Sequence, residues 1–275
     1  MIVVSAATGQ YGRLVVERLL ARVPATEVAV AVRNPARAAD LAERGVEVRR
    51  GDYDEPESLR TAFDGADRLL YISGPQLGAR IPQHRNVVAA ARDAGVGGIA
   101  YTSGLGADVV DEGVLGEHHA GEQAILRSGL PATVLRHPIY SDFFIHPTLS
   151  AAVQAGELTS STRGRGMNTA TRADLAEAAA VVLTDGDLFG RAYDFTGRRW
   201  TYPQLAAALT ELSGRTVVHR DVDEDEDVIG LLGIGPFIRA GGFERQTGDL
   251  EAVLGHPATR LEDAVAAALG VRTPA

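Results

Sequence analysis

The stretch IVVSAATGQYGRLVVERLL, residues 2–20, decides the fold of this chain. Its opening run of β-branched residues predicts a buried strand, and the leucines and valines at its end recur at helical spacing. The loop between them contains Gly9 and Gly12, with Ala6 where a G-x-x-G-x-x-G pattern would have its first glycine. A strand that turns through glycines directly into a helix is the first half of a βαβ unit.

The same alternation continues to about residue 136. Short apolar runs predict strands at residues 2–4, 28–32, 46–49, 69–72, 98–101 and 133–135. The segments between them predict helices at residues 13–22, 36–44, 56–63, 83–94 and 118–128. Because the strands are mostly continuous apolar runs, we expect a parallel sheet buried on both faces. The predicted class is α/β, a Rossmann-type doubly wound parallel sheet with a smaller C-terminal substrate lobe.

The alternation changes after Tyr140, where a loop, helices and short strands follow in a less regular order. We therefore expect a nucleotide-binding core over residues 1–150. Residues 151–275 are expected to form mostly the substrate lobe, with segments near 167–197 returning to the core.

The composition excludes several classes of protein. With 275 residues, 45% of them hydrophobic, the chain can bury a sizeable core. Its net charge of −9 argues against a nucleic-acid surface, and no apolar stretch approaches the ~18–20 residues of a membrane span. There is no cysteine, and the N-terminus does not resemble a signal peptide, so we expect a cytoplasmic protein.

All 27 basic residues are arginine. The absence of lysine excludes a P-loop NTPase, which requires one, and an enzyme that forms a lysine Schiff base. It also excludes a Tyr-x-x-x-Lys proton relay.

Two features of the first βαβ unit predict a dinucleotide site. Backbone N–H groups in the loop with Gly9 and Gly12 can face a pyrophosphate at the helix N-terminus. The second strand ends in VAVRNPAR, which places Arg33 where an NAD enzyme tends to have a carboxylate for the ribose 2′-hydroxyl. A guanidinium suits a 2′-phosphate, so NADP is preferred over NAD. The alternatives are a plain tight turn and an exposed arginine at a strand end.

Polar residues also follow the third, fourth and fifth strands, at the edge where such sheets bind ligands. Asp52 and Tyr53 lie where an adenine is expected, and Ser73 and Gly74 end a central strand. Ordinary turn chemistry is the alternative at each of these positions.

Several stretches together resemble the NmrA-like branch of the atypical short-chain dehydrogenases. Within it they are most similar to bacterial triphenylmethane-dye reductases and type 2 NADPH-dependent quinone oxidoreductases. These stretches are TGQYG, LLARVPATEVAVAVRNPARA, GVEVRRGDYDEPESL, LLYISGP, QHRNVVAAARDAGV, IAYTSG and LRHPIYSDFF. The likeness covers nearly the whole chain and is densest over residues 1–145. Three positions depart from the family pattern, namely Ala6, the segment at 118–122 (HHAGE) and Phe143.

The resemblance implies a Rossmann core, NADPH as cofactor and hydride transfer to a planar aromatic or quinoid acceptor. It places the cofactor site at Thr8, Gly9, Gln10, Tyr11, Gly12, Arg33, Asp52, Tyr53, Ser73 and Gly74. It also places His84 and Asn86 in a Q-H-x-N helix start typical of the family.

The mechanism expected for such an acceptor needs little acid catalysis, because hydride arrives at a conjugated centre. If a proton donor is used, His118 is the first candidate, with a surface histidine as the alternative. His137, Tyr140 and Phe144 follow the sixth strand and are expected to line the acceptor pocket, unless they pack in the core. A metal site is not expected, because His118 and Glu122 have no evident third ligand.

Two other functions are compatible with the same fold. One is a non-catalytic NADP-sensing regulator of a partner protein, and the other is a non-redox biosynthetic enzyme. Neither nucleic acid nor membrane is an expected partner, and the chain is expected to be a monomer or homodimer.

Overall fold

The computed structural model describes residues 1–223, 229 and 234–272. The chain divides into two compact units. The first comprises Met1–His137 and Leu175–Phe195, and the second comprises Pro138–Asp174 and Thr196–Ala275. The division falls after His137 rather than near residue 150, because the sixth strand ends at His137 and the chain then leaves the sheet.

A parallel sheet forms the centre of the first unit. Its strands lie in the order β10-β6-β5-β4-β1-β2-β3, and every pairing between neighbours is parallel. They are β1 Ile2–Ser5, β2 Val28–Val32, β3 Glu47–Arg50, β4 Arg68–Ile72, β5 Ile99–Gly104, β6 Ala132–His137 and β10 Ala192–Asp194. The β1, β2 and β5 side chains are almost entirely buried, as expected of strands covered on both faces. The predicted fold class is confirmed.

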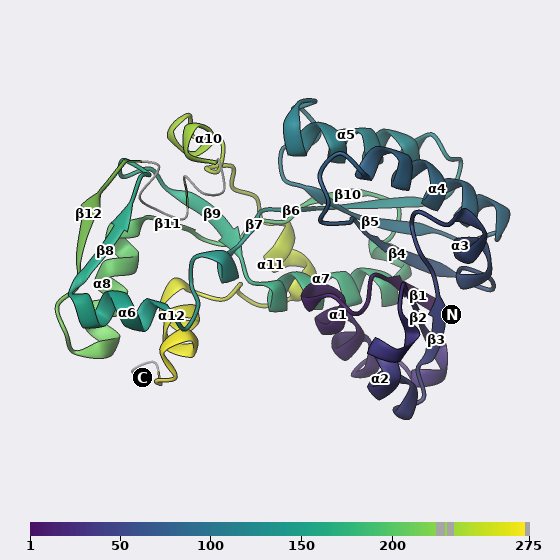
Figure 1. Ribbon diagram of the computed structural model, residues 1–275, viewed down its shortest axis with the longest axis horizontal. Coiled ribbons are helices and arrows are strands. Elements are labelled where there is room, and N and C mark those ends of the chain that lie inside the picture. Colours follow the sequence, from purple (N-terminus) through teal and green to yellow (C-terminus); the bar gives the residue numbers. More distant parts are fainter. Residues whose placement is uncertain (224–228, 230–233, 273–275) are drawn as a thin grey trace. The chain divides into compact units, whose positions relative to one another are not determined.

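Helices cover both faces of this sheet. Figure 1 shows α3, α4 and α5 together on one face, with α1 and α2 on the other. The core below α3, α4 and α5 includes Phe63, Leu69, Tyr71, Ile99 and Tyr101. The helices are α1 Gln10–Leu20, α2 Ala39–Glu43, α3 Pro56–Ala62, α4 Arg80–Asp93 and α5 Gly113–Leu126. Helix α7, Arg172–Thr184, begins in the second unit's sequence and continues in the first.

The second unit combines short strands with helices. The strands β7 Ile139–Tyr140, β9 Met167–Ala170 and β11 Arg199–Trp200 form one small sheet, and β8 Glu157–Ser160 pairs with β12 Val218–Asp221. Its described helices are α6 Leu149–Ala155, α8 Tyr202–Ser213, α10 Gly235–Arg239, α11 Asp249–Leu254 and α12 Leu261–Leu269. Trp200 packs in the core of this unit, and its indole N–H donates to the Thr169 hydroxyl at 2.8 Å.

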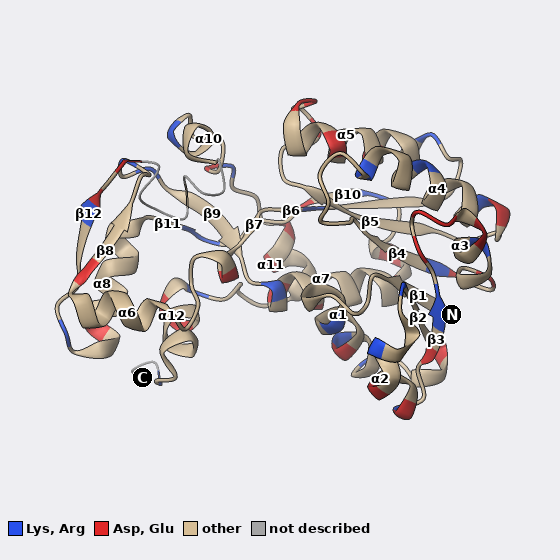
Figure 2. Ribbon diagram, in the orientation of Figure 1, with Lys and Arg blue, Asp and Glu red and all other residues tan. Residues whose placement is uncertain are grey.

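Charge is mixed over both units. Basic and acidic segments alternate along the helices and loops of each (Figure 2). Within the described residues, no helix is both long enough and apolar enough to cross a membrane.

Candidate functional site

The loop that joins β1 to α1 begins at a strained residue. Ala6 has φ of +51°, in the left-handed region that favours glycine. Its N–H donates to the Ala31 carbonyl at 3.0 Å, and its own carbonyl accepts from the Gly9 N–H at 3.0 Å. The strand-to-helix turn therefore keeps the glycine geometry although a methyl group is present.

Glycine at position 12 is required by close backbone contact. A Cβ there would lie 2.7 Å from the Ala6 oxygen and 2.8 Å from the Ala7 Cα, whereas a Cβ at Gly9 would meet nothing closer than 3.4 Å. Gly9 is the N-cap of α1, whose first turn contains no acidic residue. The first N–H groups of a helix have no partner within it. This cradle suits a diphosphate, so Thr8, Gly9, Gln10, Tyr11 and Gly12 fit the group predicted for them.

Arg33 follows β2 and is exposed. Among the described residues, its side chain forms neither an ion pair nor a hydrogen bond. The nearby turn is fixed instead by Asn34, whose side chain accepts from the Ala36 N–H at 3.1 Å. Arg13, in contrast, is paired with Asp40. The unpaired guanidinium is available for an anion such as a 2′-phosphate.

The turn after β3 is held by Tyr53. Its hydroxyl donates to the Ile72 carbonyl at 2.7 Å and lies 2.6 Å from the Ser5 hydroxyl, and its carbonyl accepts from Asn86 Nδ2 at 2.8 Å. Burial raises the pKa of Tyr53. Its phenol therefore ties this turn to β4 and β1, and the adjacent Asp52 is only part-buried.

Ser73 and Gly74 lie where β4 ends. The Ser73 N–H donates to the Thr102 hydroxyl at 3.1 Å, which joins the ends of β4 and β5. A Cβ at Gly74 would lie 2.9 Å from Gln83 Oε1. Gln83 Oε1 is buried without a hydrogen-bond partner among the described residues.

His118 lies on α5 and is 8% exposed. Its Nδ1 is 3.0 Å from the Tyr101 hydroxyl, and burial together with the charge of Arg80 lowers its pKa from 6.5 to about 3. His118 is therefore a neutral imidazole at neutral pH.

A second tyrosine–histidine pair lies beside the first. The hydroxyl of Tyr71 donates to His84 Nδ1 at 2.9 Å, because His84 Nε2 donates to the Glu117 carbonyl at 3.1 Å. Burial lowers the pKa of His84 to about 4. Gly121 makes room for both pairs, since a Cβ there would lie 2.7 Å from the Tyr101 hydroxyl and 2.9 Å from His84. This packing explains a glycine within the departing segment at residues 118–122.

An ion-pair network joins the ends of β5, β6 and β10. Ser103 donates to Glu122 Oε1 at 2.6 Å. Arg136 binds both oxygens of Glu122, at 2.9 and 2.7 Å, and also Asp194 at 3.1 Å. Arg136 is therefore the centre of this network.

His137 is buried at the end of β6 in the first unit. Its ring packs edge-on against Tyr11 of the glycine loop, with centroids 5.1 Å apart, and stacks with Phe195 at 6.1 Å. Burial lowers the pKa of His137 to about 3. Tyr11 and His137 are thus two predicted site residues that lie in contact.

Tyr140 and Phe144 belong to the second unit. Tyr140 stacks with Phe143 at 6.1 Å, and the Arg172 guanidinium lies 4.6 Å from the Tyr140 ring centroid. Phe144 is 3% exposed and packs against Trp200. Phe143, in contrast, is 42% exposed to solvent.

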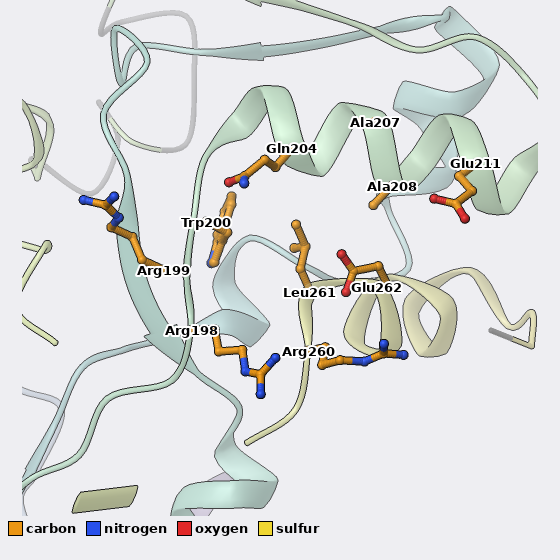
Figure 3. Close-up of a pocket in the computed structure, with 10 residues that line it drawn as sticks. All are labelled: Arg198, Arg199, Trp200, Gln204, Ala207, Ala208, Glu211, Arg260, Leu261 and Glu262. Atoms are coloured by element: carbon orange, nitrogen blue, oxygen red, sulfur yellow. The ribbon is translucent and has the colours of Figure 1, made fainter. Parts of the chain in front are cut away.

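A hollow of about 310 Å³ lies in the second unit, and none of the residues that line it is a predicted site residue (Figure 3). Trp200, Leu261 and Ala208 line it together with charged side chains. Two of its cations are already paired, Arg198 with Glu251 at 3.6 Å and Arg260 with Asp263 at 2.8 Å. Within the described part of the chain, no group of three or more histidine, aspartate or glutamate side chains could hold a metal ion.

Sequence patterns missed one residue of the carboxyl edge. Arg80, the first residue of α4, is 8% exposed and donates from Nε to the Gly74 carbonyl at 2.7 Å. No local pattern marks it, because an arginine at a helix start is ordinary on a surface.

Comparisons with known proteins cover almost the whole chain. A sequence model described as NAD(P)H-binding matches residues 6–186. Quinone oxidoreductase 2 of Escherichia coli (strain K12) is 37% identical over 279 residues, which cover 96% of this chain and 97% of that protein. The crystal structure of Citrobacter sp. triphenylmethane reductase complexed with NADP(H) has a TM-score of 0.90 and 39% identity, covering 98% of this chain and 100% of that one. The NADPH-dependent quinone oxidoreductase from E. coli complexed with NADPH has a TM-score of 0.89 and 37% identity, covering 97% and 99%. The likeness therefore includes both units, and the resemblance stated from the sequence is confirmed.

Proposed function

Because the chain belongs to the NAD(P)H-binding family, we propose that it is an NADPH-dependent reductase that transfers hydride to a quinone-like or extended aromatic acceptor. The observation that carries the proposal is the end-to-end similarity to two reductases whose crystal structures contain NADP(H) or NADPH. That similarity includes the second unit, where an enzyme of this kind is expected to select its acceptor.

The first unit provides the residues for the cofactor. The backbone of the Thr8–Gly12 loop would hold the diphosphate, and Arg33 would bind the 2′-phosphate. Asp52 and Tyr53 would lie beside the adenine, with Ser73 and Gly74 at the ribose. Once bound, the dihydronicotinamide supplies the hydride.

Acid catalysis has a small part in the proposed reaction. The chain contains no lysine, so a Tyr-x-x-x-Lys relay is absent. Because the pKa of His118 is about 3, its imidazole is neutral and acts by hydrogen bonding rather than as an imidazolium acid. The chain's main task is to hold a flat acceptor and exclude water, and His137, Tyr140 and Phe144 are proposed to contact that acceptor.

Cofactor selectivity can be tested by calorimetric titration of NADPH and NADH. We expect wild type to prefer NADPH, and Arg33→Ala to weaken NADPH binding ~10- to 100-fold, because charge-assisted hydrogen bonds contribute about 1.5–3 kcal/mol. NADH affinity should stay the same in the variant. Arg92→Ala, which removes another exposed arginine at the far end of α4, is the matched control and should change neither affinity.

The catalytic part is tested by NADPH oxidation in the presence of a quinone or a triphenylmethane dye. One NADPH consumed for each acceptor reduced supports the reductase. Binding of NADPH and NADP⁺ without turnover of any acceptor would instead support the sensor, and conversion of a substrate without net NADPH consumption would support the non-redox enzyme.

A further inference from the structure

Arg80 places a buried positive charge beside the end of β4. Its guanidinium donates from Nε to the Gly74 carbonyl at 2.7 Å, and Gly74 is one of the residues proposed to border the cofactor. Helices α4 and α5 lie side by side on the same face of the sheet (Figure 1). The guanidinium contacts the Gly74 carbonyl after β4 and also lies near His118 and Glu117 of α5.

The contacts of this guanidinium leave part of its donor capacity unused. Nη1 is 3.5 Å from His118 Nε2 and 3.6 Å from Glu117 Oε2. Nη2 has no partner among the described residues. Glu117 directs its other oxygen elsewhere, since Oε1 accepts from the Gly78 N–H at 2.6 Å. Arg80 is 8% exposed, and its guanidinium, which has five N–H donors, makes a single short hydrogen bond here.

We propose that Arg80 is a catalytic residue, whose guanidinium stabilises the oxyanion that forms on a quinone-type acceptor as it takes hydride. The inference rests on the proposed function and adds a residue and a charge preference to it. Arg80 contacts both the Gly74 carbonyl, which is proposed to lie at the ribose, and His118, so its charge lies beside the proposed reaction site. A buried cation fixed before the reaction acts more strongly than one in water.

The chemistry defines what Arg80 does. A quinone that accepts hydride gains two electrons and one proton, and one oxygen becomes the anionic oxygen of a hydroquinone monoanion. A proton from water then gives the neutral hydroquinone. NADPH is the electron donor and ends as NADP⁺. Negative charge therefore appears on the acceptor in the hydride step, where a guanidinium lowers the barrier.

A cationic triarylmethane dye undergoes the opposite change in charge. The dye cation accepts hydride at its central carbon and becomes a neutral leuco dye, without forming an oxyanion. A cation nearby gives this reaction no such help, and it repels the dye before the reaction. A comparison of the two acceptors therefore distinguishes an effect of the Arg80 charge from an effect of its structural role.

The test compares p-benzoquinone with malachite green in steady-state kinetics at saturating NADPH. We expect Arg80→Met to lower kcat with the quinone ~10²-fold, the loss typical of removing one oxyanion donor, and to leave kcat/KM with the dye unchanged or higher. Arg80→Lys keeps a cation and should recover at least ~10-fold of the lost rate. NADPH affinity of both variants is measured by calorimetry, because Arg80 also donates to the Gly74 carbonyl at the proposed cofactor rim.

Glu117→Gln is a matched variant that removes a negative charge, whereas Arg80→Met removes a positive one. The amide oxygen can still accept from Gly78, but the negative charge near Arg80 is removed. We expect kcat with the quinone to stay equal or rise and kcat/KM with the dye to fall. If Arg80 only holds the β4 loop in place, Arg80→Met should slow the reduction of the quinone and of the dye by the same factor. The same should hold for Glu117→Gln.

The outcomes keep the two proposals apart. If wild type oxidises NADPH with neither acceptor, the proposed function fails. If wild type reduces both acceptors but Arg80→Met slows them by the same factor at saturating NADPH, the role of Arg80 is overturned and the proposed function stands. If Arg80→Met does not fold, a fall in the quinone rate of Glu117→Gln overturns the role of Arg80.

Discussion

Replacement of Ala6 by glycine should stabilise the first unit. Ala6 has φ of +51° and is only part-buried, so little packing is lost with its methyl group. An L-residue in the left-handed region costs about 1–2 kcal/mol relative to the right-handed one. Glycine is also more flexible than alanine in the unfolded chain, which offsets about 0.4–1 kcal/mol of the strain energy that the replacement removes. The net expected gain is about 0.5–1 kcal/mol in the free energy of unfolding.

This gain is measurable by circular dichroism. In a protein of this size 1 kcal/mol shifts Tm by about 2–4 °C, so we expect Ala6→Gly to raise it by about 1–4 °C. Ala7→Gly is the matched control, because Ala7 is fully buried and its φ is not positive. That variant should lower Tm, since it adds flexibility and removes a buried methyl group.

The two variants together can refute the reasoning. If Ala6→Gly lowers Tm as much as Ala7→Gly does, then the strain at Ala6 is absent in solution. NADPH affinity adds a second readout, because relief at this loop should leave binding equal or stronger.

Three further changes have expected outcomes. Gly12→Ala should lower Tm and abolish NADPH binding in calorimetry, because its Cβ would lie 2.7 Å from the Ala6 backbone oxygen. Retained binding would contradict the assignment of this loop to the diphosphate. Gly121→Ala should lower the free energy of unfolding by about 1–3 kcal/mol through overpacking, because its Cβ would lie 2.7 Å from the Tyr101 hydroxyl. Tyr101→Phe removes that hydroxyl and should relieve part of the loss in a double-mutant cycle. Lowering the pH from 6.5 toward 4 should decrease the free energy of urea unfolding, by about 1.4 kcal/mol per pH unit for each buried histidine. His84 and His118 have folded pKa values of about 4 and about 3, so the unfolded chain binds protons in this range that the folded chain excludes, and a flat profile would contradict their burial.

The fold was largely predictable because its signals are local. The apolar run before the glycine loop predicts β1, and the spacing of leucine and valine behind it predicts α1. The predicted helix began at residue 13 and the observed one begins at Gln10, because the end of the glycine loop already forms the first turn. The short strand β10 joins the same sheet beside β6, although it lies more than fifty residues further along the chain.

The site was predictable only in part. The glycine loop and Arg33 follow strands directly, so their place at the carboxyl edge could be inferred from spacing. The sign of φ at Ala6 depends on the path of the turn and could not be. Arg80 and Glu117 meet only when α4 and α5 pack together, and Gly121 is explained only by the tyrosine hydroxyl that approaches it.

The most direct test of the reductase is the absorbance of NADPH at 340 nm during incubation of the purified protein with a quinone. We expect loss of NADPH in a one-to-one ratio with hydroquinone formed, and a much slower reaction with NADH at the same concentration. Saturable NADPH binding with no oxidation in the presence of either a quinone or a triphenylmethane dye would contradict the account.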